Sequence, residues 1–197
     1  MRDILILGHS HVRNLRKFVD QERLRDSRVV SNFGYADVSI HFLAKGGKTV
    51  RSSLQQDSRE IERLRPNAII VMLGDNDISE DSSGEEIGAL LVKFASKLHS
   101  LAPRATIMLT SLLPRFEPKV LNQRGRKAVA AEQYNGIAHA SNLFMSDPTD
   151  RPDYCLFWWH SKFATKDAAR GDITQMPRYR KRIVRRDGVH LTPRGKF

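Results

Sequence analysis

Short apolar runs alternate with amphipathic stretches along this chain, and that alternation limits its possible folds more than any other feature. The strand-like runs occupy residues 4–7, 36–44, 68–73, 105–110 and 154–159. No unbroken apolar run exceeds six residues, far fewer than a helix needs to span a bilayer. Strands that alternate with helices predict an α/β fold with a parallel sheet and right-handed crossovers.

Helix signals fill the intervals between these runs. Thr49 is a candidate N-cap for a helix that should end before Pro66. Helices are also predicted after the first strand, over residues 87–101 and over residues 128–143, where apolar residues recur at helical spacing. Residues 160–186 are polar and basic with weak periodicity, which predicts irregular structure. Cys155 and the neighbouring Trp158 are expected in the core or a pocket wall.

Glycine and small polar residues follow each of the first three predicted strands. These segments are Gly8-His9-Ser10, Gly46-Gly47 and Gly74-Asp75-Asn76-Asp77. Sites in open parallel sheets form beyond the carboxyl ends of the strands, so the three segments are expected to share one site. Each also has a simpler explanation, because Ser10 can cap a helix and the others suit turns.

The same segments supply the groups that acyl transfer by a serine requires. Ser10 offers a hydroxyl at a helix N-terminus, whose dipole favours developing negative charge. His190 is the candidate base, and Asp187, three residues earlier, can orient its ring. The N–H groups of Ser10 and Gly47 and the side-chain amide of Asn76 can donate to the oxyanion.

Four motifs together resemble the SGNH/GDSL hydrolase family: G-x-S after the first strand, a glycine after the second, G-x-N-D after the third, and D-x-x-H near residue 190. The resemblance implies a flavodoxin-like, three-layer α/β/α sandwich with a central parallel sheet of about five strands. It also implies ester hydrolysis without a metal or cofactor, on a small acyl ester. Ser10, Asp187 and His190 would form the triad, and Ser10, Gly47 and Asn76 the oxyanion hole.

The sequence departs from that family in two places. His9 precedes the serine where the family usually has aspartate or asparagine. Residues 1–197 are predicted to form a single domain without the family's closing C-terminal helix, either because the chain is a fragment or because that helix is missing. More narrowly, GHSHVRNL and DGVHLTPRGK are similar to SGNH domains associated with animal retrotransposons, some of them encoded beside nucleic-acid-binding modules.

Positive charge is concentrated toward the C-terminus. Residues 151–197 hold 12 Lys and Arg against 4 Asp and Glu, within a net charge of +11 for the chain. The densest part supplies the candidate nucleic-acid-binding residues Arg178, Arg180, Lys181, Arg182, Arg185 and Arg186. A solvated basic loop would have the same composition. With one cysteine and no recognisable leader, the predicted location is intracellular, in the cytoplasm or the nucleus.

Two other functions fit parts of the same pattern. A metal-dependent phosphoesterase could use His9, His11, Asp75, Asp77, Asp187 and His190 as ligands, although the first strand lacks the Asp-x-His that such enzymes generally use. A catalytically idle domain could instead bind RNA or DNA through its basic segment. The serine esterase remains the favoured hypothesis because each of its chemical roles has a candidate residue.

Overall fold

The computed structural model describes residues 1–25, 35, 37–115, 129 and 131–159. Its centre is a parallel five-stranded sheet with the order β2-β1-β3-β4-β5. The strands are β1 (Arg2–Gly8), β2 (Val38–Ala44), β3 (Ala68–Met72), β4 (Thr106–Thr110) and β5 (Cys155–Trp158). This order is the flavodoxin-like one, as the family resemblance implied.

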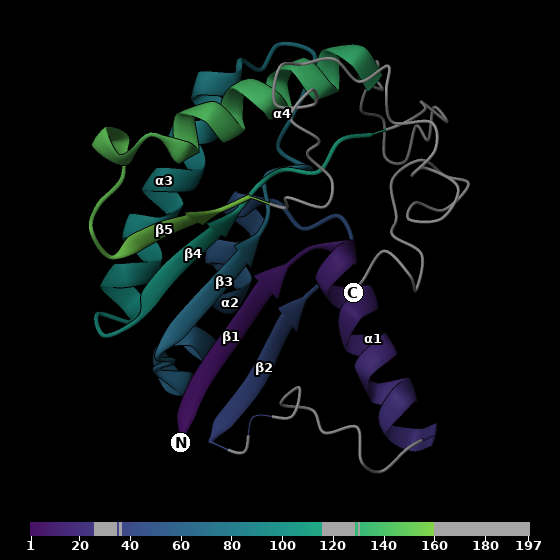
Figure 1. Cartoon of the computed structure of the whole chain (residues 1–197), viewed down its shortest axis with the longest axis vertical. Coiled ribbons are helices and arrows are strands. Elements are labelled where there is room, and N and C mark those ends of the chain that lie inside the picture. Colours follow the sequence, from purple (N-terminus) through teal and green to yellow (C-terminus); the bar gives the residue numbers. More distant parts are fainter. Residues whose placement is uncertain (26–34, 36, 116–128, 130, 160–197) are drawn as a thin grey trace.

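In the described ranges, four α-helices connect the strands (Figure 1). They are α1 (Ser10–Arg25), α2 (Val50–Leu64), α3 (Gly84–Leu101) and α4 (Ala131–Ser146), and a 3₁₀ turn, η1 (Pro148–Asp150), precedes β5. Thr49 caps α2 as predicted, in a capping box with Ser52, and Ser83 caps α3. None of the helices in the described ranges is long and apolar enough to cross a membrane.

The helices form two layers, one on each face of the sheet. The chain moves from β1 to β2 in one direction and from β2 through β3 and β4 to β5 in the other. Right-handed crossovers therefore place α1 on one face and α2, α3 and α4 on the opposite face. In agreement, α3 packs beside both α2 and α4, while α1 packs on β1 and β2. The predicted three-layer sandwich is confirmed.

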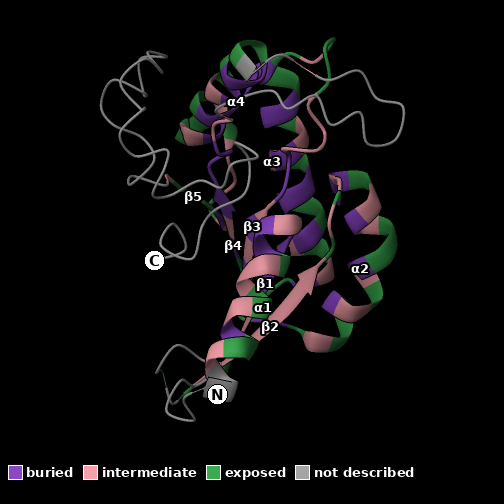
Figure 2. Ribbon diagram, turned by 90° about the vertical axis from the view of Figure 1, so that its right-hand side faces the viewer, coloured by how far each residue is buried: buried purple, intermediate pink, exposed green. Residues whose placement is uncertain are grey.

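Burial is greatest where the two helical layers pack on the middle strands of the sheet (Figure 2). Leu5 and Leu7 of β1 and Ile69 and Val71 of β3 are almost completely buried. Helices α3 and α4 approach closely, since a Cβ on Gly84 would lie 2.2 Å from the Ala140 Cβ. This rigid centre fixes the carboxyl ends of β1 and β3 relative to each other.

The predicted strands are confirmed to within two residues at each end, but two expectations need correction. Helix α4 spans Ala131–Ser146 rather than residues 128–143. Trp158 is 52% exposed and so lies outside the core, because β5 is the edge strand of the described sheet and every second residue faces outward; its place in a pocket wall stays a prediction. Cys155 is buried as expected, and burial raises the pKa of its thiol to about 11.

Candidate active site

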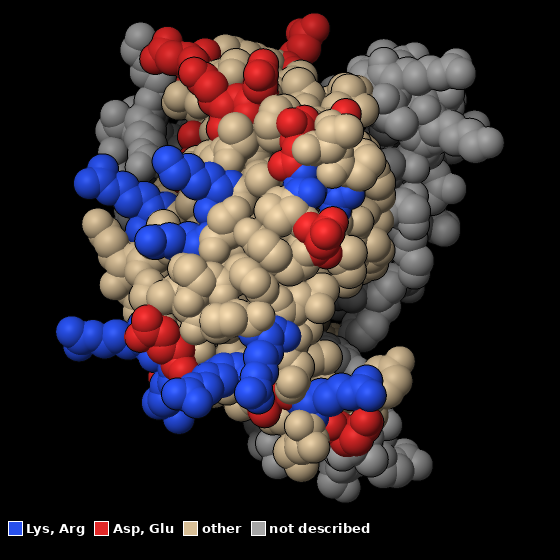
Figure 3. Space-filling view, turned by 90° about the vertical axis from the view of Figure 1, so that its left-hand side faces the viewer, with Lys and Arg blue, Asp and Glu red and all other residues tan. Residues whose placement is uncertain are grey.

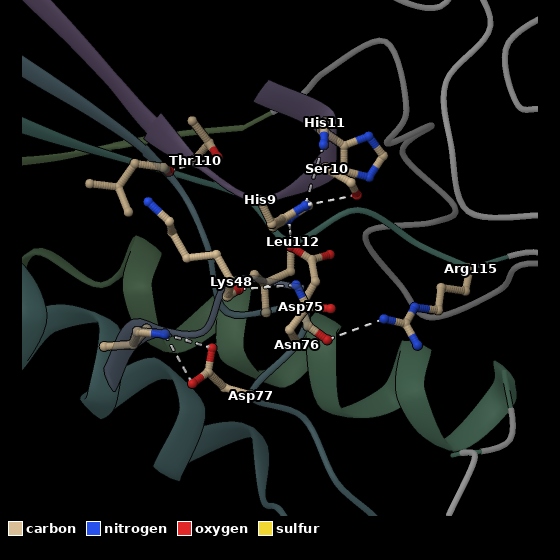
Figure 4. A network of polar contacts seen from close by, with 12 residues as sticks. His9, Ser10, His11, Lys48, Asp75, Asn76, Asp77, Thr110, Leu112 and Arg115 are labelled. Carbon is tan, nitrogen blue, oxygen red and sulfur yellow. Dashed lines mark hydrogen bonds and ion pairs between the residues drawn. The ribbon is translucent and has the colours of Figure 1, made fainter. Parts of the chain in front are cut away.

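The candidate site lies at the point where the strand connections change direction. The connection after β1 runs toward β2, and the connection after β3 runs away from it, toward β4. Between such strands a crevice opens at the carboxyl edge of the sheet. His9 and Ser10 follow β1, and Asp75, Asn76 and Asp77 follow β3, so the two polar segments converge there (Figure 4).

The corner after β1 is built around close backbone contact. A Cβ on Gly8 would lie 2.4 Å from the Val12 Cγ2 and 2.8 Å from the Met72 carbonyl oxygen, so no side chain fits there. His9 occupies the position just before α1, where its carbonyl accepts the N–H of Arg13 at 3.1 Å. Its Nδ1 accepts the N–H of His11 at 3.4 Å, which is the bond that an N-cap side chain makes.

Ser10 is therefore the first residue of α1, and His9 rather than Ser10 holds the cap position. The Ser10 Oγ lies 3.5 Å from the His9 Nδ1. The hydroxyl thus stands at the positive end of the helix dipole, where developing negative charge is stabilised. The structure places the predicted nucleophile at the expected edge of the sheet.

A chain of hydrogen bonds continues from His9 into the interior. The His9 Nε2 lies 2.7 Å from the Asp75 Oδ2, and the Tyr134 hydroxyl donates to the Asp75 Oδ1 at 2.6 Å. His9 is only 3% exposed and Tyr134 is fully buried. Burial raises the pKa of the Tyr134 hydroxyl well above its ordinary value, and the neighbouring Asp75 carboxylate raises it further. Tyr134 therefore acts as a hydrogen-bond donor.

The same contacts hold the pKa of the Asp75 carboxyl well below its ordinary value. Burial by itself raises that pKa, but attraction to the His9 ring and the hydrogen bonds from His9 and Tyr134 outweigh burial. A carboxyl with a lowered folded-state pKa stabilises the fold above its unfolded pKa of about 3.9. That contribution disappears as the pH falls toward the folded-state value.

Asp75→Asn should accordingly change how stability depends on pH. The variant should be less stable than the wild type at about pH 6, and the gap in the free energy of unfolding should be smaller at about pH 3, because the unfolded-state carboxyl then begins to bind protons. Urea denaturation at both pH values measures this gap. A gap of constant size would show that the Asp75 carboxylate does not contribute through its ionisation.

Two backbone loops meet beside this corner. Gly74 and Gly47 both have positive φ values, of 109° and 70°, which glycine adopts without strain. The Asn76 side-chain amide donates to the Lys48 carbonyl at 3.0 Å, and the Asp77 carboxylate accepts the N–H of Val50 at 3.1 and 3.2 Å. The turn after β3 is thereby tied to the loop after β2, which brings Asn76 close to the Gly47 segment.

A buried ion pair supports the loop after β2. Lys48 Nζ donates to the Asp57 Oδ2 at 2.6 Å, and both residues are less than a tenth exposed. The Ser53 hydroxyl donates to the same carboxylate oxygen at 2.7 Å. The ion pair thus anchors Lys48 to α2, and the carbonyl of Lys48 in turn orients the Asn76 amide.

Helix α4 closes the other side of the site. Its Asn135 accepts the backbone N–H of Arg115 and donates to the Arg115 carbonyl, at 2.8 Å in both cases. The Arg115 guanidinium lies 3.9 Å from the centre of the Tyr134 ring and donates to the Asp75 carbonyl at 3.2 Å. Sequence reasoning missed Tyr134 because this residue lies inside a helix rather than at the end of a strand.

The predicted residues divide into two groups. Ser10, at the start of α1, and Gly47 and Asn76, on the loops after β2 and β3, lie at the same edge of the sheet. Asp187, His190 and the basic segment from Arg178 to Arg186 lie outside the described residues. Within the described ranges, no three His, Cys, Asp or Glu side chains are grouped so that they could hold a metal ion.

Comparison with known proteins identifies the family. The sequence profile of the GDSL-like lipase/acylhydrolase family matches residues 19–196, most of the chain. The chain belongs to this family. The matched residues include the turn after β3 and the D-x-x-H motif, whereas the corner at Ser10 precedes them.

Individual relatives agree with that assignment. The chain is 28% identical over 127 residues to platelet-activating factor acetylhydrolase IB subunit alpha2 of Homo sapiens. The aligned region is 64% of this chain and 50% of that protein, so the chain spans about half the length of the curated relatives it matches.

Solved structures share the fold at lower identity. A GDSL-like lipase from Bacteroides thetaiotaomicron is similar with a TM-score of 0.62 and 13% identity, covering 98% of this chain and 82% of that one. An acetyl xylan esterase, AlAXEase, is similar with a TM-score of 0.61 and 12% identity, covering 98% and 93%. At these identities the likeness shows the GDSL-like fold alone.

Proposed function

We propose that the protein is a serine esterase that hydrolyses a small acyl ester. The observation that carries this proposal is the position of Ser10, whose hydroxyl stands at the start of α1 and faces His9, which contacts Asp75 in the turn that carries Asn76. A serine in that setting has a helix dipole and hydrogen-bond donors nearby. Membership of the acylhydrolase family supports the same chemistry.

In the proposed reaction, Ser10 attacks the ester carbonyl while His190 takes the hydroxyl proton. Asp187 orients the His190 ring and stabilises the imidazolium that forms. The N–H groups of Ser10 and Gly47 and the Asn76 amide donate to the oxyanion. Protonated His190 then gives its proton to the leaving alkoxide, and water attacks the acyl-enzyme by the same route in reverse. Neither a metal nor a cofactor takes part in the proposed steps.

The structure supports the role of Asn76 in particular. Its amide nitrogen carries two hydrogens, and the bond to the Lys48 carbonyl fixes the plane of the amide. A donor held in this way needs little reorganisation when charge develops on the substrate. We therefore assign Asn76 to the oxyanion hole together with the neighbouring Gly47.

A short acetate ester tests the proposal directly. The curated relative is named an acetylhydrolase and one structural relative an acetyl xylan esterase, so an acetyl group is the favoured acyl unit. Purified protein should hydrolyse p-nitrophenyl acetate, and the rate should be unchanged in EDTA. Loss of activity in EDTA that zinc or manganese restores would favour the metal-dependent phosphoesterase instead.

Binding of nucleic acid is a second candidate function, favoured by the basic segment at residues 178–186 and by the similarity to retrotransposon-associated domains. Figure 3 shows charges of both signs on one face of the described part, with acidic side chains gathered at one end. The nucleic-acid proposal rests on the sequence, and it is compatible with esterase activity or with an idle site.

Binding to a labelled single-stranded RNA should weaken steeply with salt if this second function is correct. Each phosphate contact that releases a counterion adds to the slope of log affinity against log salt. Neutralising Arg180, Lys181 and Arg182 together should lower both the affinity and that slope in a filter-binding or anisotropy titration. Affinity that hardly changes between low and high salt would exclude the proposal.

A further inference from the structure

The contacts of His9 determine which of its two ring nitrogens carries a hydrogen. The backbone N–H of His11 can only donate, so the Nδ1 that it meets at 3.4 Å acts as an acceptor. The hydrogen of the neutral ring then lies on Nε2, which donates to the Asp75 Oδ2 at 2.7 Å. Asp75 thus holds His9 in the tautomer whose Nδ1 lone pair faces the start of α1 (Figure 4).

The Nδ1 lone pair also faces the Ser10 hydroxyl. The two atoms are 3.5 Å apart, and catalytic hydrogen bonds of this length in a ligand-free site shorten when substrate binds. Ser10, His9 and Asp75 thus have the connectivity of a serine, an imidazole base and an orienting carboxylate. Tyr134 fixes the carboxylate by donating to its other oxygen.

Capping of α1 does not require a histidine. Asparagine or aspartate at position 9 could accept the same N–H of His11 through a side-chain oxygen, and both are preferred caps. What histidine adds is a second ring nitrogen that reaches Asp75 while the first still faces the Ser10 hydroxyl. The contact between His9 and Asp75, rather than the cap, therefore distinguishes the corner after β1.

We propose that His9 is a second base for Ser10, oriented by Asp75 and Tyr134 and independent of His190. This inference rests on the proposed role of Ser10 as nucleophile. As the Ser10 Oγ bonds to the acyl carbon, its proton moves to the His9 Nδ1, and the bond from the His11 N–H is given up. The imidazolium is stabilised by Asp75, and the proton then passes from Nδ1 to the oxygen of the leaving alkoxide.

Other charged or titratable groups face this pair. The His11 ring lies 4.9 Å from the His9 ring between centroids, on α1. Tyr134 reaches Asp75 from α4, and Arg115, which follows β4, donates to the Asp75 carbonyl. Among the described residues, only a carboxylate oxygen of Asp75 lies within ion-pairing distance of the His9 ring. Asp75 is therefore the residue whose removal should most weaken His9 as a base.

The labelling rate of Ser10 by a fluorophosphonate probe tests the proposal in the full-length protein. His190→Ala should retain slow labelling that increases with pH as an imidazole base loses its proton. Adding His9→Asn, which keeps a good cap, should lower that residual rate by about 10²-fold and remove its pH dependence. Adding Asp75→Asn instead of His9→Asn should also lower the residual labelling rate.

A matched control is available in His41, whose Nε2 pairs with the Asp3 Oδ1 at 2.9 Å, away from the carboxyl edge of the sheet. His41→Asn in the His190→Ala background should leave the rate and the pH profile unchanged. If His190→Ala has the same labelling rate and pH profile with and without His9→Asn, the proposed role of His9 is overturned, and the proposed role of Ser10 is unaffected. If His9→Asn does not fold, the Asp75→Asn comparison decides in the same way. A wild type unlabelled at Ser10 would overturn the nucleophile as well.

Discussion

Replacing Ser10 by alanine should lower the hydrolysis of p-nitrophenyl acetate by about 10⁴-fold or more, because the alanine variant has no group that can form the acyl-enzyme. The residual rate should be that of a site with oxyanion donors and no nucleophile. The substitution should leave the fold intact, since alanine favours the first turn of α1 and Ser10 is only partly buried. The steady-state rate per folded molecule, with folding checked by circular dichroism, measures the effect.

Ser96 provides the matched control for this substitution. It is an exposed helical serine on α3, far in sequence from the site, and its hydroxyl donates to the Val92 carbonyl. Ser96→Ala should retain wild-type activity, so a loss specific to Ser10→Ala identifies the nucleophile. Full activity in Ser10→Ala would show that the reaction occurs at another site. The corner after β1 would then be catalytically idle.

The fold could be predicted from sequence because its determinants are local. Apolar runs such as residues 68–73 and the capping residue Thr49 each specify an element without reference to distant parts of the chain. The limits of α4 were less predictable. Its buried face includes the polar residues Asn135, Ser141 and Asn142, two of which bond to the chain leaving β4, so apolar periodicity locates its ends poorly.

The site was predictable only in part, for the same reason. Gly47, Asn76 and Ser10 follow predicted strands, and the rule on carboxyl ends brings such positions to one edge. The contact between His9 and Asp75 joins residues 66 positions apart, and the contact between Asp75 and Tyr134 joins residues 59 apart. A single sequence carries no signal for such a pairing. This sequence showed only that a histidine, His9, is unusual at the position beside the serine.

The Lys48–Asp57 pair was equally hidden, and its loss should have the largest effect on stability. Asp57→Ala leaves the Lys48 ammonium buried without its partner, since the two side chains are only 3% and 9% exposed. Breaking a buried ion pair on one side typically costs about 3–5 kcal/mol of unfolding free energy. Urea denaturation of the variant should show this loss as a lower midpoint with an unchanged slope.

Two comparisons distinguish a buried charge from a lost contact. Lys48→Met combined with Asp57→Leu removes both charges, and apolar residues of similar size should recover most of the stability. Glu60→Ala breaks the exposed pair of Glu60 with Arg63 on the same helix and should cost far less than Asp57→Ala. Equal losses for Asp57→Ala and Glu60→Ala would show that Lys48 finds water or another partner.

The same variants separate stability from catalysis. The Lys48 carbonyl holds the Asn76 amide, and Gly47 directly precedes Lys48, so the ion pair fixes two of the three proposed oxyanion donors through one backbone segment. Asp57→Ala should therefore lower kcat per folded molecule. The variant with both Lys48→Met and Asp57→Leu should recover kcat only to the extent that it restores the conformation of the loop after β2. If folded Asp57→Ala has the wild-type kcat, the bond between Asn76 and Lys48 is sufficient to orient the amide without the ion pair.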